Sequence, residues 1–389
     1  MPLSSPAPVH GETAEGFEPV AQAFRQNFAE RNELGAAVTV VVRGRTVVDL
    51  WGGWTDEERR APWRRPTLTN LWSSTKGLVA LCALQLVESG DLDLDAPVAR
   101  YWPEFAAAGK AGIPVRWLLS HRSGVTGVAP EHPLQIDDLL DWTKMTLLLS
   151  AQEPLFEPGS ASGYHALSYG FLVGEVIRRI AGQTVGEFFR ANVASPLNVD
   201  VHIGVNRDDL ARCSTMVEPG AGPERTVAPD RATLAALANP LPLGRTANLT
   251  RWRVAEVPAA NGHGTAHGLA TIYGALADGS ERLLRHETIE LGRTGQGRCR
   301  DLVMGLDNEF GLGFTLGSDQ LSFGPHPRAF GHDGFGGSTG FADPESGVGF
   351  GYVMNRMGPH PRDDPRKMAL VDATYACLAR LAQPSVKVR

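Results

Sequence analysis

The segment Leu-Trp-Ser-Ser-Thr-Lys-Gly, at residues 71–77, places a serine three residues before a lysine. In a helix, residues at this spacing share a face about one turn apart, so the side chains of Ser73 and Lys76 can meet. A lysine that is desolvated near the positive end of a helix dipole is pushed toward its neutral amine, which can accept the serine proton. Backbone amides at the same helix start point to the place where an oxyanion would form. The spacing therefore predicts a nucleophilic serine with a lysine partner.

The same residues also have a structural explanation, in which Ser73 caps a helix and Lys76 is solvated. Ser-x-x-Lys is a short motif that also arises by chance. The context favours catalysis, because Lys76 leads into the apolar run GLVALCALQLVES, where a solvated lysine is not expected. Only five of the 37 basic residues are lysines. The other four lie in polar or terminal stretches where solvation is expected, namely Lys110, Lys144, Lys367 and Lys387.

The phrase LWSSTKGLVALCALQLVESGDLDLDAPV, followed by VRWLLSHRSGV, resembles the serine β-lactamase and penicillin-binding-protein superfamily. The resemblance is to its class C-like branch, which includes the family VIII carboxylesterases, and it covers most of the chain, from the N-terminal hairpin to GYVMN. In this superfamily the serine of Ser-x-x-Lys is acylated and the lysine helps to activate it. The resemblance therefore implies that Ser73 is the nucleophile and that Lys76 is its partner.

A second motif of that branch is a tyrosine at the start of a helix, followed two residues later by asparagine. In EPGSASGYHALSYGF the tyrosine in register after Pro-Gly is Tyr164. A tyrosine beside a lysine can act as the base in acylation and as the acid toward the leaving group. The alternative, Tyr169, falls inside the predicted helix, which favours a packing role. Ala166 occupies the asparagine position, so an amide that helps to hold a β-lactam is missing. His165 is a candidate for substrate binding, although we expect its side chain to face outward.

The third motif is normally Lys-Thr-Gly on the strand that lines the cleft, and its equivalent in FGHDGFGGSTGF is His332-Asp333-Gly334. Gly334 would let the backbone approach the substrate, and the amide of Phe335 would join that of Ser73 as an oxyanion donor. His332 stands where the motif has a lysine, so the cation that would hold a β-lactam carboxylate is lost. This favours a neutral ester, with His332 lining the substrate site. A purely structural role of His332 in a turn is the alternative.

Two other patterns have less support, and a third is absent. The Gly-x-Ser-x-Gly around Ser338 matches the nucleophile elbow of α/β-hydrolases, but that elbow needs a helix after it, and GFADPESG is turn-prone. His263 and His267 are four residues apart, as in zinc proteases, but the glycines around them oppose a helix. Asn261-Gly262-His263-Gly264 instead resembles a loop near the cleft in the class C-like branch, which implies a substrate-lining role. No glycine-rich phosphate loop is present. The sequence therefore predicts no metal and no cofactor.

The order of elements predicts how these residues are brought together. Apolar residues recur at helical spacing from Phe17, AAVTVVVRGRTVVDLWGGW predicts a hairpin, and strand-like runs and a helix over residues 365–381 lie near the C-terminus. The middle is mostly helical. These features predict an α/β (α+β) fold, with an antiparallel sheet built from both termini, flanked by helices, and an inserted all-helical lobe. Residues 1–70 and 287–389 would form the α/β lobe, residues 71–286 the mainly helical lobe, and the active site would lie in the cleft between them.

The composition is typical of an ordinary folded protein, with 389 residues, 42% of them hydrophobic and 21% charged. A net charge of −6 argues against a nucleic-acid or anionic-membrane binder. The four cysteines form no Cys-x-x-Cys pair, which fits free thiols in a reducing compartment. The first sixteen residues lack the pattern of a signal peptide, and no run approaches the roughly 18 apolar residues of a membrane span. We therefore expect a cytoplasmic protein with no nucleic-acid or membrane partner. The sequence does not predict the oligomeric state.

These observations predict a serine hydrolase that forms an acyl-enzyme, most simply a carboxylesterase acting on short-chain esters. The alternatives within the superfamily are a β-lactamase, a D-alanyl peptidase or amidase, and an acyltransferase that passes the acyl group to an alcohol. An inactive relative that serves as a binding or sensor module is the non-enzymatic alternative. The presence of Ser73, Lys76 and Tyr164 together argues against that last possibility, because a binding module has no need of all three.

Overall fold

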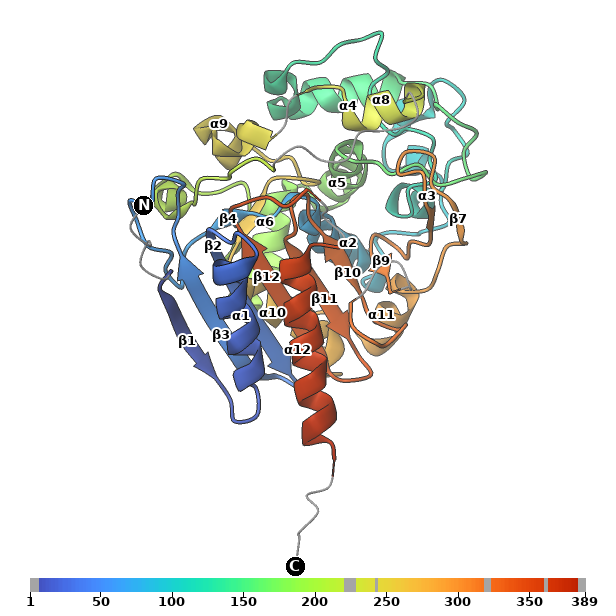
Figure 1. Cartoon of the computed structure of the whole chain (residues 1–389). Helices are drawn as coiled ribbons and strands as arrows, with labels where there is room; N and C mark the ends of the chain where they lie inside the picture. The colour runs from blue at the N-terminus through green and yellow to red at the C-terminus, as the bar shows by residue number, and fades with distance from the viewer. Residues whose placement is uncertain (1–6, 220–228, 242–243, 318–322, 360–362, 384–389) are drawn as a thin grey trace, which may run out of the picture.

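The computed structural model describes residues 7–219, 229–241, 244–317, 323–359 and 363–383. Its main feature, within these residues, is a seven-stranded antiparallel sheet with the strand order β1-β3-β2-β12-β11-β10-β9 (Figure 1). The strands are β1 Val9–Thr13, β2 Gly35–Val42, β3 Arg45–Gly53, β9 Thr315–Leu316, β10 Phe330–Asp333, β11 Thr339–Asp343 and β12 Val348–Met354. Because β2 pairs with β12, segments from the two ends of the chain meet at the centre of the sheet. The predicted sheet from both termini is confirmed.

Helices cover both faces of this sheet. The helices α1 (Glu18–Glu30) and α12 (Pro365–Leu381) lie side by side on one face, at the front of Figure 1, and α10 (Ala266–Ala277) packs across β12 and β2. In β12, Phe350 and Tyr352 belong to the core beneath α1 and α12, whereas the alternate residues face α10. A Cβ atom on Gly349 would lie 2.2 Å from the backbone nitrogen of Gly274 in α10. Glycine is therefore required for this helix to lie so close to the sheet.

The helix α2 (Thr75–Glu88) is buried along most of its length because it is apolar on nearly every side, and among the remaining helices it packs against α5, α6 and α11. The remaining helices are α3 Val115–Leu119, α4 Trp142–Ala151, α5 Ser168–Ala181, α6 Val185–Phe189, α7 Ser195–Leu197, α8 Arg231–Leu237, α9 Thr250–Val254 and α11 His286–Gly292. Several of them gather beyond one end of the strands, at the top of Figure 1. α2 contacts α5 and also β10, so its first turn lies between the helices and the sheet. Among the described residues, no helix is both long and apolar enough to cross a membrane.

Two short sheets were not expected from the sequence. One has the order β4-β6-β5, formed by Thr69–Asn70, Gly262–Gly264 and Val201–Ile203, and the other pairs β7 Cys299–Arg300 with β8 Asp307–Asn308. Strands of two or three residues are too short to show an alternating pattern. The predicted division into two lobes stays a prediction. One helix differs from it, because α10 falls in the range expected for the helical lobe but packs on the sheet.

Candidate active site

Ser73 lies in a 3₁₀ turn, Trp72–Ser74, directly before α2, and Lys76 lies in the first turn of that helix. The Nζ atom of Lys76 is 3.0 Å from Ser73 Oγ, 2.8 Å from the carbonyl oxygen of Ala166 and 3.0 Å from that of Ala259. Burial lowers the pKa of Lys76 well below its ordinary value of 10.5. A neutral amine would donate its two N–H groups to the two carbonyls and present its lone pair to the serine hydroxyl. This geometry would allow Lys76 to act as a general base toward Ser73.

The turn that carries Ser73 has an unusual backbone conformation. Trp72 has a φ of 47°, in the left-handed region that bulky residues rarely adopt. The hydroxyl of Thr75 donates to the carbonyl oxygen of Trp72 at 2.6 Å. The Trp72 ring packs against Trp252 and Phe335, with ring centroids 6.1 Å and 5.6 Å apart. These contacts hold the turn in a conformation of a kind that is concentrated at active sites.

Tyr164 lies beside the same amine. The Lys76 Nζ atom is 4.8 Å from the centroid of its ring. The ring also stacks on Phe310 at 6.2 Å and contacts His121 at 4.9 Å. The structure thus brings Ser73, Lys76 and Tyr164 together from two separate segments of the chain. The alternative tyrosine, Tyr169, is buried inside α5, and burial raises its pKa well above 10, which fits a packing role.

The third motif, His332-Asp333-Gly334, lies against the turn that carries Ser73. The Ser74 hydroxyl donates to the carbonyl oxygen of His332 at 3.1 Å. A Cβ atom on Gly334 would lie 2.3 Å from the carbonyl oxygen of Leu71. The absence of a side chain at Gly334 therefore allows β10 to approach the turn that carries Ser73, whereas the sequence had suggested an approach to the substrate. The next residue, Phe335, is 41% exposed.

A cavity of about 610 Å³ opens at this place. Its lining includes five of the predicted site residues: Ser73, Tyr164, His332, Gly334 and Phe335. Most of the other lining side chains are apolar, among them Trp72, Ala166, Leu167, Leu237, Met304 and Phe310. Glu218 and Asp333 also line it, but none of the described lining residues is a lysine or an arginine. The cavity therefore suits an uncharged, largely apolar ligand.

His165 does not lie where the sequence suggested. Its side chain is fully buried, so the expected outward orientation is wrong, and it is not among the residues that line the cavity. Its Nε2 atom is 2.6 Å from the hydroxyl oxygen of Ser123, and its Nδ1 atom is 2.5 Å from the carbonyl oxygen of Gly163. Burial lowers the pKa of His165 to about 4. A neutral imidazole with two polar partners explains how a histidine is accommodated in this position.

Ser338, the other candidate nucleophile, and His263, the first histidine of the pair, are both buried in contacts within the fold. Ser338 is buried, its hydroxyl donates to the carbonyl oxygen of Leu71 at 2.8 Å, and it leads into β11 and not into a helix. His263 is buried in β6, with Nδ1 2.8 Å from the carbonyl oxygen of Asn261, and it does not line the cavity. Among the described residues, no cluster of three or more His, Cys, Asp or Glu side chains could hold a metal ion.

Sequence reasoning missed Asp301, which organises the segment that carries Tyr164. Its carboxylate accepts hydrogen bonds from the backbone nitrogen of Tyr164 at 3.1 Å and from the hydroxyl of Ser162 at 2.9 Å. It also accepts from the backbone nitrogens of Val303 and Met304 at 3.0 Å and 2.8 Å. Asp301 is fully buried, yet it is 137 residues away from Tyr164 in the chain. No local pattern could have connected the two.

Two further lysines contradict the expectation that all lysines except Lys76 are solvated. Lys110 and Lys367 are both buried. The Lys110 Nζ atom donates to three carbonyl oxygens, those of Ala107, Ser150 and Gln152, at 2.6 to 2.9 Å. Lys367 forms an ion pair with Asp333, at 3.2 Å. Burial alone therefore does not single out Lys76. Its contact with Ser73 does.

Comparison with known proteins identifies the family. The family model described as Beta-lactamase matches residues 20–375. The chain belongs to the β-lactamase family. This member is 35% identical over 374 residues to the esterase/beta-lactamase LipL of Mycobacterium tuberculosis, covering 90% of this chain and 83% of that protein. A family VIII carboxylesterase of known structure is 40% identical, with a TM-score of 0.90 over 95% of this chain and 100% of that one. A penicillin-binding-protein homologue from Caulobacter crescentus is 39% identical, with a TM-score of 0.88 over the same shares of the two chains. The predicted superfamily and fold are confirmed.

Proposed function

We propose that this β-lactamase family member is a carboxylesterase that hydrolyses uncharged carboxylic esters through an acyl-enzyme on Ser73. The observation that carries the proposal is the 3.0 Å contact between Ser73 Oγ and the buried Nζ of Lys76. Relatives named as esterases support the choice of substrate. They include LipL, the family VIII carboxylesterase, and EstA from Arthrobacter nitroguajacolicus, which is 33% identical with a TM-score of 0.86 over 95% of this chain and 99% of that one.

In the proposed mechanism, Ser73 Oγ forms a bond to the ester carbonyl carbon while its proton passes to Lys76 or Tyr164. The backbone amides of Ser73 and Phe335 donate to the oxyanion of the tetrahedral intermediate. The carbon–oxygen bond to the alcohol then breaks, and Tyr164 protonates the departing alkoxide, which leaves an acyl group on Ser73. Water attacks this acyl-enzyme by the same steps in reverse order and releases the carboxylic acid together with free Ser73.

The cavity supports an uncharged substrate over an anionic one. A β-lactam carries a carboxylate, which proteins hold with lysine or arginine. The described lining offers neither, and its two carboxylates, those of Glu218 and Asp333, are already paired with Arg245 and Lys367. At the positions where the superfamily motifs have lysine and asparagine, this chain has His332 and Ala166. A volume of about 610 Å³ also accommodates acyl or alcohol groups larger than those of the smallest esters.

The proposal is tested by incubating the protein with p-nitrophenyl acetate, p-nitrophenyl butyrate and nitrocefin, alongside Ser73→Ala and the matched control Ser338→Ala. We expect the wild type and Ser338→Ala to release nitrophenol and Ser73→Ala to fall to the background rate. The proposal fails if the wild type releases none, or if Ser338→Ala alone abolishes turnover. Nitrocefin opening faster than ester hydrolysis would instead identify a β-lactamase.

A further inference from the structure

The loop between β10 and β11, residues 334–338, is attached to two different parts of the molecule. On one side it meets the nucleophile turn, through Ser338 and Ser74. On the other side it meets the start of α12. The Nζ atom of Lys367 lies 3.2 Å from both carboxylate oxygens of Asp333, directly before the loop. Arg366 donates from Nη2 to the carbonyl oxygen of Gly336 at 3.3 Å. Phe335 lies within the stretch that these two contacts bracket.

Two backbone hydrogen bonds close the loop, from the Gly334 nitrogen to the Ser338 carbonyl oxygen at 2.7 Å and from the Gly337 nitrogen to the Gly334 carbonyl oxygen at 3.0 Å, and its composition leaves the rest of its shape to its surroundings. Gly334, Gly336 and Gly337 make up three of its five residues, and the last two have φ angles of 92° and 117°. Glycine has more conformational freedom than any other residue, so contacts with the surroundings add to these two bonds in fixing the position of the loop. An oxyanion donor must lie about 2.7–3.1 Å from the oxyanion, which leaves little tolerance for a mobile loop.

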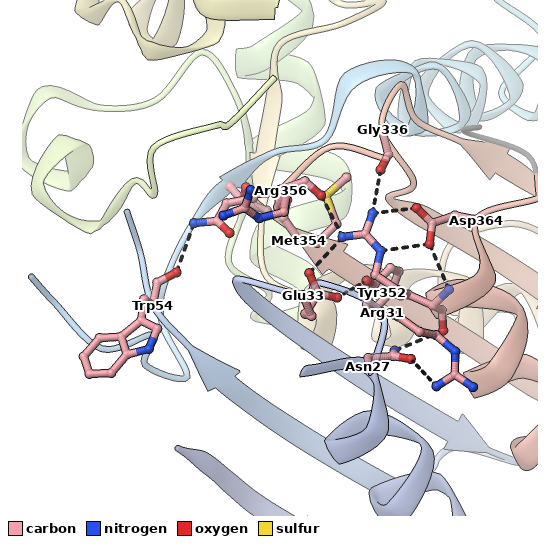
Figure 2. Close-up of polar contacts among 12 residues, drawn as sticks. Asn27, Arg31, Glu33, Trp54, Gly336, Tyr352, Met354, Arg356 and Asp364 are labelled. Atoms are coloured by element: carbon pink, nitrogen blue, oxygen red, sulfur yellow. Dashed lines mark hydrogen bonds and ion pairs between the residues drawn. The ribbon is translucent and has the colours of Figure 1, made fainter. Parts of the chain in front are cut away.

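Arg366 is itself held rigidly. It is 4% exposed, and each of its five N–H groups has an acceptor. Nε and Nη2 donate to the carboxylate of Asp364 at 2.9 Å and 2.5 Å, and Nη1 donates to Glu33 Oε1 at 3.0 Å and to the carbonyl oxygen of Arg356 at 2.8 Å. The fifth N–H reaches Gly336. Figure 2 shows Glu33, Asp364, Arg356 and Gly336 around this centre. A planar guanidinium with every donor engaged has a single orientation.

The network extends beyond α12. Glu33 precedes β2 and is buried, and the Tyr352 hydroxyl of β12 donates to its second carboxylate oxygen. Asp364 also contacts the loop directly, because a Cβ atom on Gly337 would lie 2.8 Å from Asp364 Oδ2. The central strands of the sheet and the first turn of α12 thus act on the same few residues of the loop. Buried ion pairs contribute little net stability compared with apolar packing. Their convergence on this loop points to a geometric role.

We propose that the first turn of α12 positions the oxyanion donor. Lys367, through Asp333, and Arg366, through Gly336, hold the loop so that the Phe335 amide points to the oxyanion. Neither residue touches the substrate, so both are positioning residues. The inference rests on the proposed function, because it takes the Phe335 amide as a donor in ester hydrolysis.

The test compares Lys367→Met with Lys110→Met. Both variants remove a buried lysine, but Lys110 donates to three carbonyl oxygens and does not line the cavity. Thermal unfolding, kcat and KM for p-nitrophenyl butyrate, and inhibition by phenylboronic acid are measured for each. Phenylboronic acid forms a bond from boron to Ser73 Oγ, and its tetrahedral adduct places an oxygen at the oxyanion position.

Losing an oxyanion donor costs about 10²–10³-fold in kcat, so its displacement in Lys367→Met should cost about 10–100-fold, with KM changed less than about threefold. The inhibition constant for phenylboronic acid should rise by a similar factor. Lys110→Met should lower the unfolding temperature and leave kcat unchanged. Equal kcat in Lys367→Met and the wild type would overturn the inference. If Lys367→Met does not fold, Asp333→Asn takes its place, because it keeps the shape of the side chain and removes its charge. We expect about a tenfold loss of kcat in this variant. An unchanged kcat would contradict the inference.

Failure of the proposed function gives a different result. In that case the wild type neither hydrolyses the ester nor binds phenylboronic acid, and Ser73→Ala behaves like the wild type. Failure of the positioning role alone leaves an active wild type, an inactive Ser73→Ala, and a Lys367→Met variant with unchanged kcat.

Discussion

Replacing Lys76 by arginine tests whether this residue acts as a neutral base. Arginine has the positive charge of a protonated lysine and can still donate to the carbonyl oxygens of Ala166 and Ala259, but it cannot lose its proton at accessible pH. Ser73 would lose the acceptor that now lies 3.0 Å away. A positioned base contributes about 10²–10⁴-fold to the rate, which corresponds to about 3–5 kcal/mol in the activation barrier. We expect kcat/KM of Lys76→Arg for p-nitrophenyl butyrate to fall by this factor.

Lys76→Met is the matched variant. Methionine has a similar length but neither charge nor donor, so it leaves the two buried carbonyl oxygens without their lysine partner, at about 1–3 kcal/mol each in the free energy of unfolding. We expect Lys76→Met to be as slow as Lys76→Arg and to be less stable in urea unfolding. A loss of rate that both variants share belongs to the missing base, because only arginine carries a positive charge at this position.

The assay is nitrophenol release as a function of pH. The active form has a neutral Lys76, so kcat/KM of the wild type should rise with pH through the pKa of Lys76, which burial lowers well below 10.5, and should be lost as the pH falls below that pKa. Both variants should lack this rise. The reasoning is refuted if Lys76→Arg retains kcat/KM within about tenfold of the wild type and shows the same rise, since lysine would then act as a cation.

Three other outcomes follow from the site. Tyr164→Phe, which keeps the ring contacts, should lower kcat by about 10²–10⁴-fold with little change in KM; unchanged kcat would remove Tyr164 from the proton transfer. His332→Lys places a cation in the cavity and should raise the ratio of nitrocefin opening to p-nitrophenyl butyrate hydrolysis at least about tenfold, or about 1.4 kcal/mol, and an unchanged ratio would contradict the account of substrate charge. Burial lowers the pKa of His165 to about 4 from 6.5, so the unfolded state binds more protons below pH 6.5, and the free energy of unfolding should fall by about 3 kcal/mol by pH 4. The measurement is urea unfolding at pH 7 and pH 4.5. Between these two pH values the free energy of unfolding should fall less in His165→Gln than in the wild type or in the exposed control His10→Gln. Equal falls in all three proteins would refute a lowered pKa at His165.

The sequence predicted the features that depend on local spacing. Ser73 and Lys76 meet because they are one helical turn apart, and α2 is buried because its sequence is apolar on nearly all sides. The hairpin β2–β3 and the helix α12 also have the expected places. In each case a short segment carries its own signal, through a periodic pattern or a turn. Such local patterns predict the structure correctly where no tertiary contact favours a different conformation.

The sequence could not predict features that depend on contacts between distant segments. His165 follows Tyr164 directly, but its orientation depends on Ser123 and on His121, whose Nδ1 accepts from the His165 backbone nitrogen at 3.1 Å. Asp301 reaches Tyr164 from a different part of the chain. Lys367 lies in a polar stretch of sequence, yet it is buried and pairs with Asp333 of β10. Polar sequence context indicates solvation only where no distant partner is available.

The central claim is that Ser73 carries the acyl group. It is tested most directly by quenching the reaction with p-nitrophenyl butyrate in acid during turnover, digesting the protein and locating the added butyryl mass by mass spectrometry. We predict that the butyryl group is on the peptide containing residues 71–77, at Ser73, and that Ser73→Ala carries none. Turnover with the adduct at Ser338 or another residue, or an adduct of equal amount in Ser73→Ala, would contradict the account.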